Sequence, residues 1–494
     1  MAIYSPQPNS STMVQDTMKD LLSQAYDPAS FRALGHQLID LLADHLESAQ
    51  APENQQVINY REPEEELKFW QNDFARAGEE GASLTFFEDL LEHSMHLHHP
   101  HYIGHQVSVP APINALAGMV SDILSNGTGV YEVGMASNAL ERVVTDFTAQ
   151  KIGYPETASG FITSGGTLAN LTALLAARAA KAPQQVWTKG HGAKLAIMVS
   201  EEAHYCVDRA ARILGMGSEG IIKIPVDHQF KIRIDLLETY YQEALAAGLV
   251  PIALIGCAGS TATGSYDDLH ALADFSEKHE LWYHVDGAHG GAVAFSDKYK
   301  HLAAGMERAD TIVLDYHKLL MAPALNTALL FREGHRSYDT FIQRAQYLWE
   351  AEQSPEWYQS GKRTFECTKL MLSIKVYASL RAYGPAIFGE NVDRLYDQAQ
   401  VFAQILQLAP DFELAVLPEA NIVNFRYTGI PHEDWDIKNG QIRQRLVENG
   451  SFYVVQTVIN GERWLRATVM NPFTNHQHFE KLLNTIRSLA ATLD

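Results

Sequence analysis

Between about residues 160 and 335, short apolar runs with strand character alternate with segments of helical periodicity. The strand-like runs are 194–200, 251–259, 281–287, 311–317 and 327–334, and the helical segments are 168–182 and 266–280. This alternation predicts an α/β fold in which helices cover a mostly parallel sheet. Ligands of such sheets bind beyond the carboxyl ends of the strands, so we expect functional side chains there.

The flanking regions have different patterns. Upstream, residues 31–47 place Phe31, Leu34, Leu38, Leu42 and Leu46 on one helical face, which requires a packing partner such as a second subunit. Downstream, a polar segment at 351–366 predicts a long loop, followed by a helix at 367–384, strands at 421–429 and 463–472, and a helix at 478–493. We therefore predict an N-terminal helical segment (1–95), a large domain (96–366) and a smaller α+β domain (367–494).

Composition excludes several classes of protein. The 494 residues carry a formal charge of −21, which argues against nucleic acids and anionic membranes as partners. The three cysteines are far apart and odd in number, so we expect no disulfide framework and a cytoplasmic, reducing setting. The N-terminus lacks the basic and apolar regions of a signal peptide, and we find no apolar run long enough to span a bilayer.

The stretch 162–178, ITSGGTLANLTALLAAR, runs from a strand end into glycines and then a helix. Small residues allow backbone N–H groups to approach an anion, and the start of a helix adds partial positive charge. This pattern predicts a phosphate site at Gly165, Gly166 and Thr167. The alternative is an ordinary helix N-cap at Ser164 or Thr167 with the glycines in a tight turn.

Two charged residues follow later strands. Asp286 ends an apolar strand and precedes small residues, and Lys318 ends the next strand. Alone, Asp286 could be a structural cap, and Lys318 an edge lysine that reaches water. Together with a phosphate site, they describe a pyridoxal phosphate site, because that cofactor needs a phosphate partner, a ring-nitrogen partner and an amine.

Histidines add further candidates. His204 follows another strand, where an imidazole could stack on a ring or simply bond within a loop. The stretch 93–106, HSMHLHHPHYIGHQ, has six histidines but no HExxH pattern and no cysteine support, so we predict no metal site there. The stretch 126–134, NGTGVYEVG, is either a pocket loop or a plain turn.

The segments TSGGTLANLTALLAAR, AHY, HVDGAHGG and HK, in this order, resemble the group II pyridoxal phosphate-dependent amino acid decarboxylases. The resemblance runs from His99-Pro100 to about residue 470. It implies the fold-type-I, aminotransferase-like architecture with a seven-stranded type of sheet. It also implies a homodimer with shared active sites.

The resemblance also implies roles for individual residues around the cofactor. Lys318 matches the Schiff-base lysine, and Asp286 matches the acid that pairs with the ring nitrogen. Ala288 matches the small residue against the ring, His204 the stacking histidine, and Thr261 the threonine near the ring hydroxyl. Phosphate-side positions match Gly165, Gly166, Thr167 and His317.

On the substrate side, Arg466 matches the arginine that holds the substrate carboxylate, for which its forked guanidinium is suited. An interface salt bridge is the alternative for Arg466. Tyr102 is the expected pocket wall. Tyr358 is the expected proton donor from the loop after the sheet domain, and Ser354 is the other residue that could occupy that place.

Asp315 departs from the pattern of the family, which often has asparagine at this position. Because a carboxylate near a phosphate would repel it, we expect Asp315 to turn away or to bond a backbone group.

These observations predict a carboxy-lyase of amino acid metabolism that converts an L-amino acid to its amine and CO2. The loop spacing and the TFECTK segment are closer to the glutamate and diaminobutyrate branches, which favours an acidic amino acid or 2,4-diaminobutyrate. The alternatives are an aromatic L-amino acid, or an aldehyde-forming or aminotransferase activity on the same fold.

Overall fold

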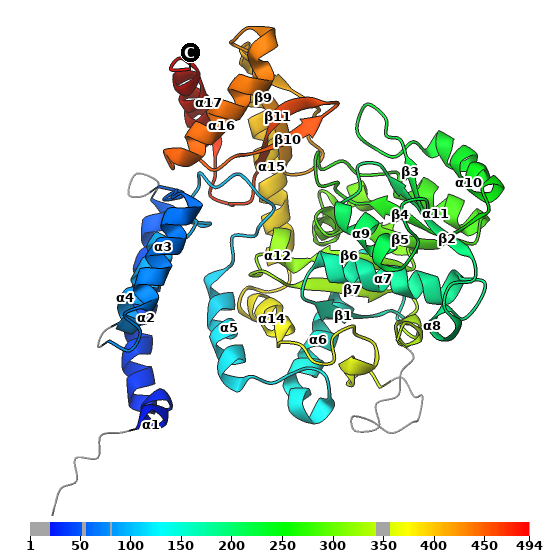
Figure 1. Cartoon of the computed structure of the whole chain (residues 1–494), viewed down its shortest axis with the longest axis horizontal. Helices are drawn as coiled ribbons and strands as arrows, with labels where there is room; N and C mark the ends of the chain where they lie inside the picture. The colour runs from blue at the N-terminus through cyan, green and yellow to red at the C-terminus, as the bar shows by residue number, and fades with distance from the viewer. Residues whose placement is uncertain (1–19, 52–55, 80–81, 342–355, 494) are drawn as a thin grey trace, which may run out of the picture. The chain divides into compact units, whose positions relative to one another are not determined.

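The computed structural model describes residues 20–51, 56–79, 82–341 and 356–493 (Figure 1). The chain divides into two compact units, one of residues 1–48 and 61–94, and one of residues 49–60 and 95–494. The domain boundaries predicted at residues 95 and 366 stay predictions.

The smaller unit is helical in its described residues. Its helices are α1 (Leu21–Ala25), most of α2 (Pro28–Gln50), α3 (Pro63–Phe74) and α4 (Ala82–Glu92). The helix predicted at 31–47 is confirmed within α2. Pro63 starts α3, and its first turn contains three glutamates. Their negative charges stabilise the helix by interacting with the positive end of its dipole. Within this unit His93 Nδ1 lies 2.8 Å from Glu66 Oε2.

A seven-stranded sheet organises the larger unit, in the order β1-β7-β6-β5-β4-β2-β3. The strands are β1 (Ser159–Thr163), β2 (Lys194–Ser200), β3 (Ile221–Ile224), β4 (Leu249–Cys257), β5 (Trp282–Asp286), β6 (Thr311–Asp315) and β7 (Thr327–Phe331). Only β7 runs antiparallel to its neighbours, so the mostly parallel sheet is confirmed. The five strand-like runs correspond to β2, β4, β5, β6 and β7. Sequence analysis did not predict β3, a short, half-buried edge strand.

Helices cover both faces of this sheet (Figure 1). The helices of this region are α5 (Pro112–Leu124), which packs on a later helix, and α6 (Tyr131–Ile152), α7 (Gly166–Lys181), α8 (Val186–Lys189), α9 (Tyr205–Ile213), α10 (Leu237–Ala246), α11 (Leu269–Lys278), α12 (Tyr316–Leu319) and α13 (Arg336–Asp339). Short 3-10 turns are η1 (Ile234–Leu236), η2 (Gly290–Phe295), η3 (Lys300–Ala303), η4 (Met306–Arg308) and η5 (Ser360–Lys362). Successive strand residues enter opposite cores: Ile312 and Leu314 join one buried cluster, and Val313 the other.

The C-terminal part forms a four-stranded antiparallel sheet in the order β10-β11-β9-β8. Its elements are α14 (Leu372–Tyr383), α15 (Ile387–Leu408), β8 (Phe412–Leu414), β9 (Ile422–Tyr427), η6 (His432–Asp434), α16 (Trp435–Glu448), β10 (Val455–Ile459), β11 (Glu462–Thr468) and α17 (His476–Ala490). The smaller α+β part is therefore confirmed. The helix predicted from residue 367 begins only at Leu372, and the preceding Lys369 bonds through its backbone to Thr128 instead.

Two absences among the described residues bear on function. No helix among the described residues is long and apolar enough to cross a membrane. Within the same residues, no group of three or more His, Cys, Asp or Glu side chains is placed to hold a metal ion. In the histidine-rich stretch, the His96 and His101 Nδ1 atoms lie 2.8 Å from the carbonyl oxygens of Gln56 and Ser451, respectively.

Candidate active site

Five chain segments converge at the carboxyl edge of the parallel strands. They follow β1, β2, β4, β5 and β6, and they surround a cavity of about 310 Å³. Every residue predicted to hold the cofactor lines this cavity, namely Gly165, Gly166, Thr167, His204, Thr261, Asp286, Ala288, His317 and Lys318. The topology therefore brings the predicted set together.

The turn after β1 has the backbone of an anion site. Gly165 has φ +134°, a conformation that side chains disfavour, and it is the N-cap of α7 without any side-chain cap. The alternative of a Ser164 or Thr167 cap is therefore wrong. The first N–H groups of α7 are left for another acceptor, as in helix-terminal phosphate sites.

Asp286 is held by a relay that sequence analysis did not predict. Its Oδ1 accepts a hydrogen bond from the Ala288 N–H (3.1 Å), and its Oδ2 accepts one from Asn170 Nδ2 (3.4 Å). Asn170, on α7, accepts in turn from His284 Nε2 (2.8 Å). Burial lowers the pKa of His284 to about 4, so this ring is a neutral donor. The relay fixes the direction in which the Asp286 carboxylate faces the cavity.

Lys318 faces an unexpected partner. Its Nζ lies 3.0 Å from Asp315 Oδ2, while Asp315 Oδ1 accepts a hydrogen bond from Thr327 Oγ1 at 2.5 Å. The expectation that Asp315 turns away or bonds a backbone group is wrong, since its side chain is only 2% exposed and lines the cavity. A buried carboxylate requires a counter-ion, and the Lys318 ammonium supplies it.

Two histidines flank this pair. His204 caps α9, with Nδ1 accepting from the Cys206 N–H at 3.3 Å, and burial lowers its pKa while the Asp286 charge opposes that shift. A neutral, flat ring at the cavity wall suits stacking. His317 is buried, and its Nδ1 lies 3.0 Å from the backbone of Asn326.

His289 also lines the cavity and was not predicted from the sequence. Its Nε2 lies 2.6 Å from Asn421 Oδ1. Burial, followed by the Lys318 charge, lowers the pKa of His289 to about 3, so the ring stays neutral. The HVDGAHGG motif contains it, but only the fold shows which residues of that motif face inward.

The predicted substrate-side residues lie outside the cavity lining. Arg466, on β11 and 6% exposed, donates to the carbonyl oxygens of Thr261 (2.7 Å) and Ala262 (3.2 Å). Burial lowers its pKa to about 10. Tyr102 is buried, stacks on Tyr453 at 5.6 Å between ring centroids and donates to the His105 carbonyl.

Tyr358 packs near Tyr131, with 5.4 Å between ring centroids, and does not line the cavity. Partial burial raises the pKa of the Tyr358 hydroxyl, and the charge of Glu356 raises it further. Ser354 falls within residues 342–355, outside the described residues.

Residues 88–428 match the pyridoxal-dependent decarboxylase conserved domain. This chain belongs to that family. It is 27% identical to an aromatic-L-amino-acid decarboxylase of Bacillus atrophaeus, over 93% of this chain and 95% of that protein. It is 28% identical to an L-aspartate decarboxylase of Metarhizium robertsii, over 75% of this chain and 74% of that protein.

Among solved structures, the chain is similar to the glutamate decarboxylase domain of diaminobutyrate-pyruvate transaminase and L-2,4-diaminobutyrate decarboxylase from Vibrio parahaemolyticus. The TM-score is 0.83 at 25% identity, over 96% of this chain and 97% of that one. The fold-type-I architecture is therefore confirmed.

The pyridoxal-dependent decarboxylase family makes this protein a carboxy-lyase whose cofactor is pyridoxal 5'-phosphate. The described cavity fits that group. It offers uncapped N–H groups at the start of α7, a carboxylate at Asp286 and an amine at Lys318 within one lining. The phosphate, the ring nitrogen and the aldehyde each need one of these three partners.

Proposed function

We propose that this protein removes the α-carboxylate of an acidic L-amino acid or of 2,4-diaminobutyrate, releasing CO2 and the amine. The proposal is carried by the convergence of Lys318, Asp286 and the Gly165-Gly166 turn on one cavity. When bound, pyridoxal phosphate supplies an electron-withdrawing ring that stabilises negative charge at the α-carbon.

The side chains around the cavity would then act as follows. Lys318 provides the amine that holds the cofactor and gives way to the substrate. Asp286, oriented by Asn170, keeps a proton at the ring nitrogen. His204 and Ala288 would hold the flat ring, and Thr261 would bind its hydroxyl. His317 and the 165–167 turn hold the phosphate.

The substrate side is assigned to three other residues. Arg466 binds the α-carboxylate by its forked guanidinium, and its bonds to the 261–262 backbone leave other N–H groups for that purpose. Tyr102 forms a wall of the substrate pocket. Tyr358 returns a proton to the α-carbon. This requires Tyr358 to move from its place beside Tyr131 toward the cavity.

Relatives support more than one substrate class. The Metarhizium robertsii relative is named an L-aspartate decarboxylase. The Vibrio parahaemolyticus structure is described as a domain of diaminobutyrate-pyruvate transaminase and L-2,4-diaminobutyrate decarboxylase. These names favour the acidic and diaminobutyrate branches. The Bacillus atrophaeus relative supports an aromatic substrate as the second candidate.

A substrate panel tests the proposal. Purified protein with pyridoxal phosphate would be given aspartate, glutamate, cysteine sulfinate, 2,4-diaminobutyrate, tyrosine and tryptophan, each in turn. We expect CO2 and amine in equal amounts from one of the first four, at a kcat/KM at least about tenfold above that for the aromatic pair. Preference for an aromatic substrate would select the second candidate. Aldehyde in place of amine, or amino transfer to a keto acid without CO2, would contradict amine-forming decarboxylation.

We also propose a homodimer with shared active sites in the cytoplasm. The three free thiols support the compartment. On α5, an apolar stripe with helical spacing is exposed in the single chain, comprising Leu116, Met119, Val120 and Ile123. Val133 and Met135 on α6 add to this apolar surface. Exposed apolar stripes of this kind are typical of subunit interfaces, and a second copy is the proposed partner.

The dimer is tested with Val120→Glu combined with Ile123→Glu. We expect this variant to become monomeric, because two carboxylates cannot be buried unpaired in an apolar interface. Light scattering after size-exclusion chromatography measures the mass. Leu408→Glu is the matched control, since Leu408 is 86% exposed on α15, outside the stripe. A dimer that persists in the double variant would contradict the proposed interface.

A further inference from the structure

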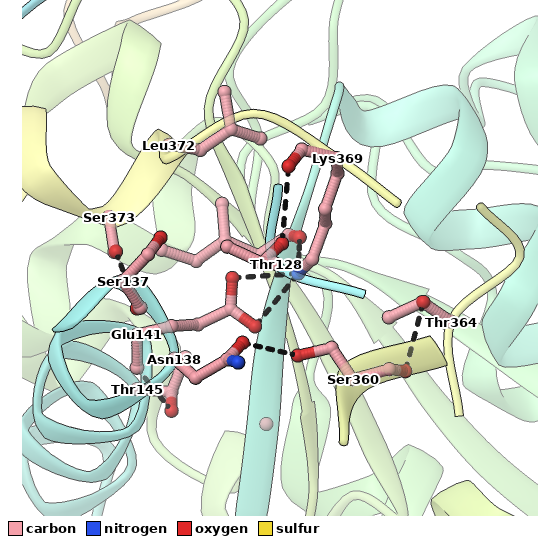
Figure 2. A network of polar contacts seen from close by, with 12 residues as sticks. Thr128, Ser137, Asn138, Glu141, Thr145, Ser360, Thr364, Lys369, Leu372 and Ser373 are labelled. Carbon is pink, nitrogen blue, oxygen red and sulfur yellow. Dashed lines mark hydrogen bonds and ion pairs between the residues drawn. The ribbon is translucent and has the colours of Figure 1, made fainter. Parts of the chain in front are cut away.

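A buried ion pair between Lys369 and Glu141 lies beside β1, the first strand of the large sheet (Figure 2). Lys369 Nζ lies 2.7 Å from both carboxylate oxygens of Glu141, on α6, and donates to the Ile162 carbonyl oxygen of β1 at 2.5 Å. Lys369 is 8% exposed and Glu141 is 2% exposed. The three acceptors satisfy the three N–H donors of the ammonium.

The backbone of Lys369 is held as firmly as its side chain. Its carbonyl oxygen accepts from the Thr128 N–H at 3.1 Å and from Thr128 Oγ1 at 3.3 Å. A Cβ atom added to Gly129 would lie 2.2 Å from the Cys367 carbonyl oxygen, so the two segments touch along their backbones. The 126–134 stretch thus packs against the segment that carries Lys369.

The same segment contacts β1 along its length. Arg363 donates to Ser159 Oγ and to the Gly160 carbonyl oxygen, both at 2.7 Å. Because β1 is an edge strand, alternate carbonyl groups point away from its partner β7. Arg363 and Lys369 therefore bind the outward carbonyls of Gly160 and Ile162.

These contacts end at the wall of the cavity. Ile162 is followed by Thr163, the last residue of β1, and by the Ser164-Gly165-Gly166 turn. Ser164 Oγ lies 3.2 Å from Glu366 Oε1, so the turn is bonded to the segment directly as well. The position of the turn relative to α6 is therefore set by the buried contacts of Arg363 and Lys369 and by the exposed contact of Glu366.

We propose that Lys369 and Glu141 are positioning residues for the cofactor phosphate. Their ion pair fixes the position of the Ile162 carbonyl. It thereby fixes the position of the turn that follows, whose N–H groups would bind the phosphate. The inference rests on the proposed role of the 165–167 turn. It also gives a reason for burying charges here. A buried ion pair contributes little net stability, and an apolar pair of similar volume would stabilise the fold as well or better.

The test compares two ligands, pyridoxal 5'-phosphate and pyridoxal, which lacks the phosphate. Equilibrium dialysis would give the dissociation constant of each for the full-length protein and for Lys369→Met and Glu141→Gln. We expect each variant to bind pyridoxal 5'-phosphate about tenfold more weakly or worse, with pyridoxal binding changed less than about twofold. A merely structural role would weaken both ligands alike.

Leu446→Ala is the matched control, because it removes a buried side chain from α16 in the C-terminal part. It should lower the midpoint of thermal unfolding without changing the preference for the phosphorylated ligand. Glu141→Gln keeps the size and an acceptor, so it serves if Lys369→Met does not fold.

Three outcomes are distinct. An unchanged ratio of the two dissociation constants in folded variants would overturn the role of the ion pair while leaving the proposed function intact. A wild-type protein that binds both ligands equally would overturn the phosphate assignment of the turn itself. A loss of phosphate preference confined to the Lys369 and Glu141 variants would support the inference.

Discussion

Lys318→Ala should lose decarboxylase activity by on the order of 10³-fold or more, because no other amine takes over covalent attachment of the cofactor. Borohydride reduction and peptide mass spectrometry should find the cofactor on the peptide with Lys318 in the wild-type protein and no adduct in the variant. Lys318→Arg should also be inactive, although it retains the positive charge beside Asp315.

The environment of Lys318 adds a second expected effect on stability. Asp315 is 2% exposed, and Lys318→Ala leaves its carboxylate without the ammonium 3.0 Å away. Lys318 is 21% exposed, so losing its ammonium beside the buried carboxylate costs about 1–3 kcal/mol, and the cofactor-free variant should unfold at a lower denaturant concentration. The matched double variant Lys318→Ala/Asp315→Asn should recover most of that stability and none of the activity. A borohydride adduct on another lysine would contradict the assignment of Lys318.

Much of the cavity could be predicted because its residues follow strands in the sequence. The carboxyl ends of parallel strands meet at one edge, so Asp286 and Lys318 converge once the strands are placed. Gly165 and Gly166 carry a local signal of the same kind, because glycines between a strand and a helix suit an anion. These residues depend on the order of elements and on local chemistry, which the sequence contains.

Other parts depend on long-range contacts that have no local pattern. Asn170 is one of several polar residues in its helix, and its role becomes evident only when α7 lies over Asp286 and His284. Lys369 and Glu141 are 228 positions apart, and each reads as an ordinary surface charge. The direction of Asp315 was predicted wrongly because repulsion from a phosphate was considered without the attraction of Lys318.

Asp286→Asn should retain the fold while kcat falls by about 10²–10³-fold. Asparagine has the same shape and its oxygen can still accept from the Ala288 N–H, so the turn after β5 keeps its geometry, although its amide nitrogen cannot accept from Asn170 Nδ2 as Asp286 Oδ2 does. The change removes the negative charge that would keep a proton at the ring nitrogen. Because the loss concerns charge that develops during the reaction, kcat should fall much more than the affinity for substrate.

An independent reporter of the Asp286 charge is His204. Burial lowers the pKa of His204 and the Asp286 carboxylate opposes this, so Asp286→Asn should lower that pKa further. Titration of the His204 ring by NMR in cofactor-free protein measures this without any turnover. Asp310→Asn is the matched control, since Asp310 accepts from the Tyr283 N–H at the other end of the strands. Equal kinetic losses in the two variants, or an unchanged His204 titration in Asp286→Asn, would contradict an electrostatic role for Asp286.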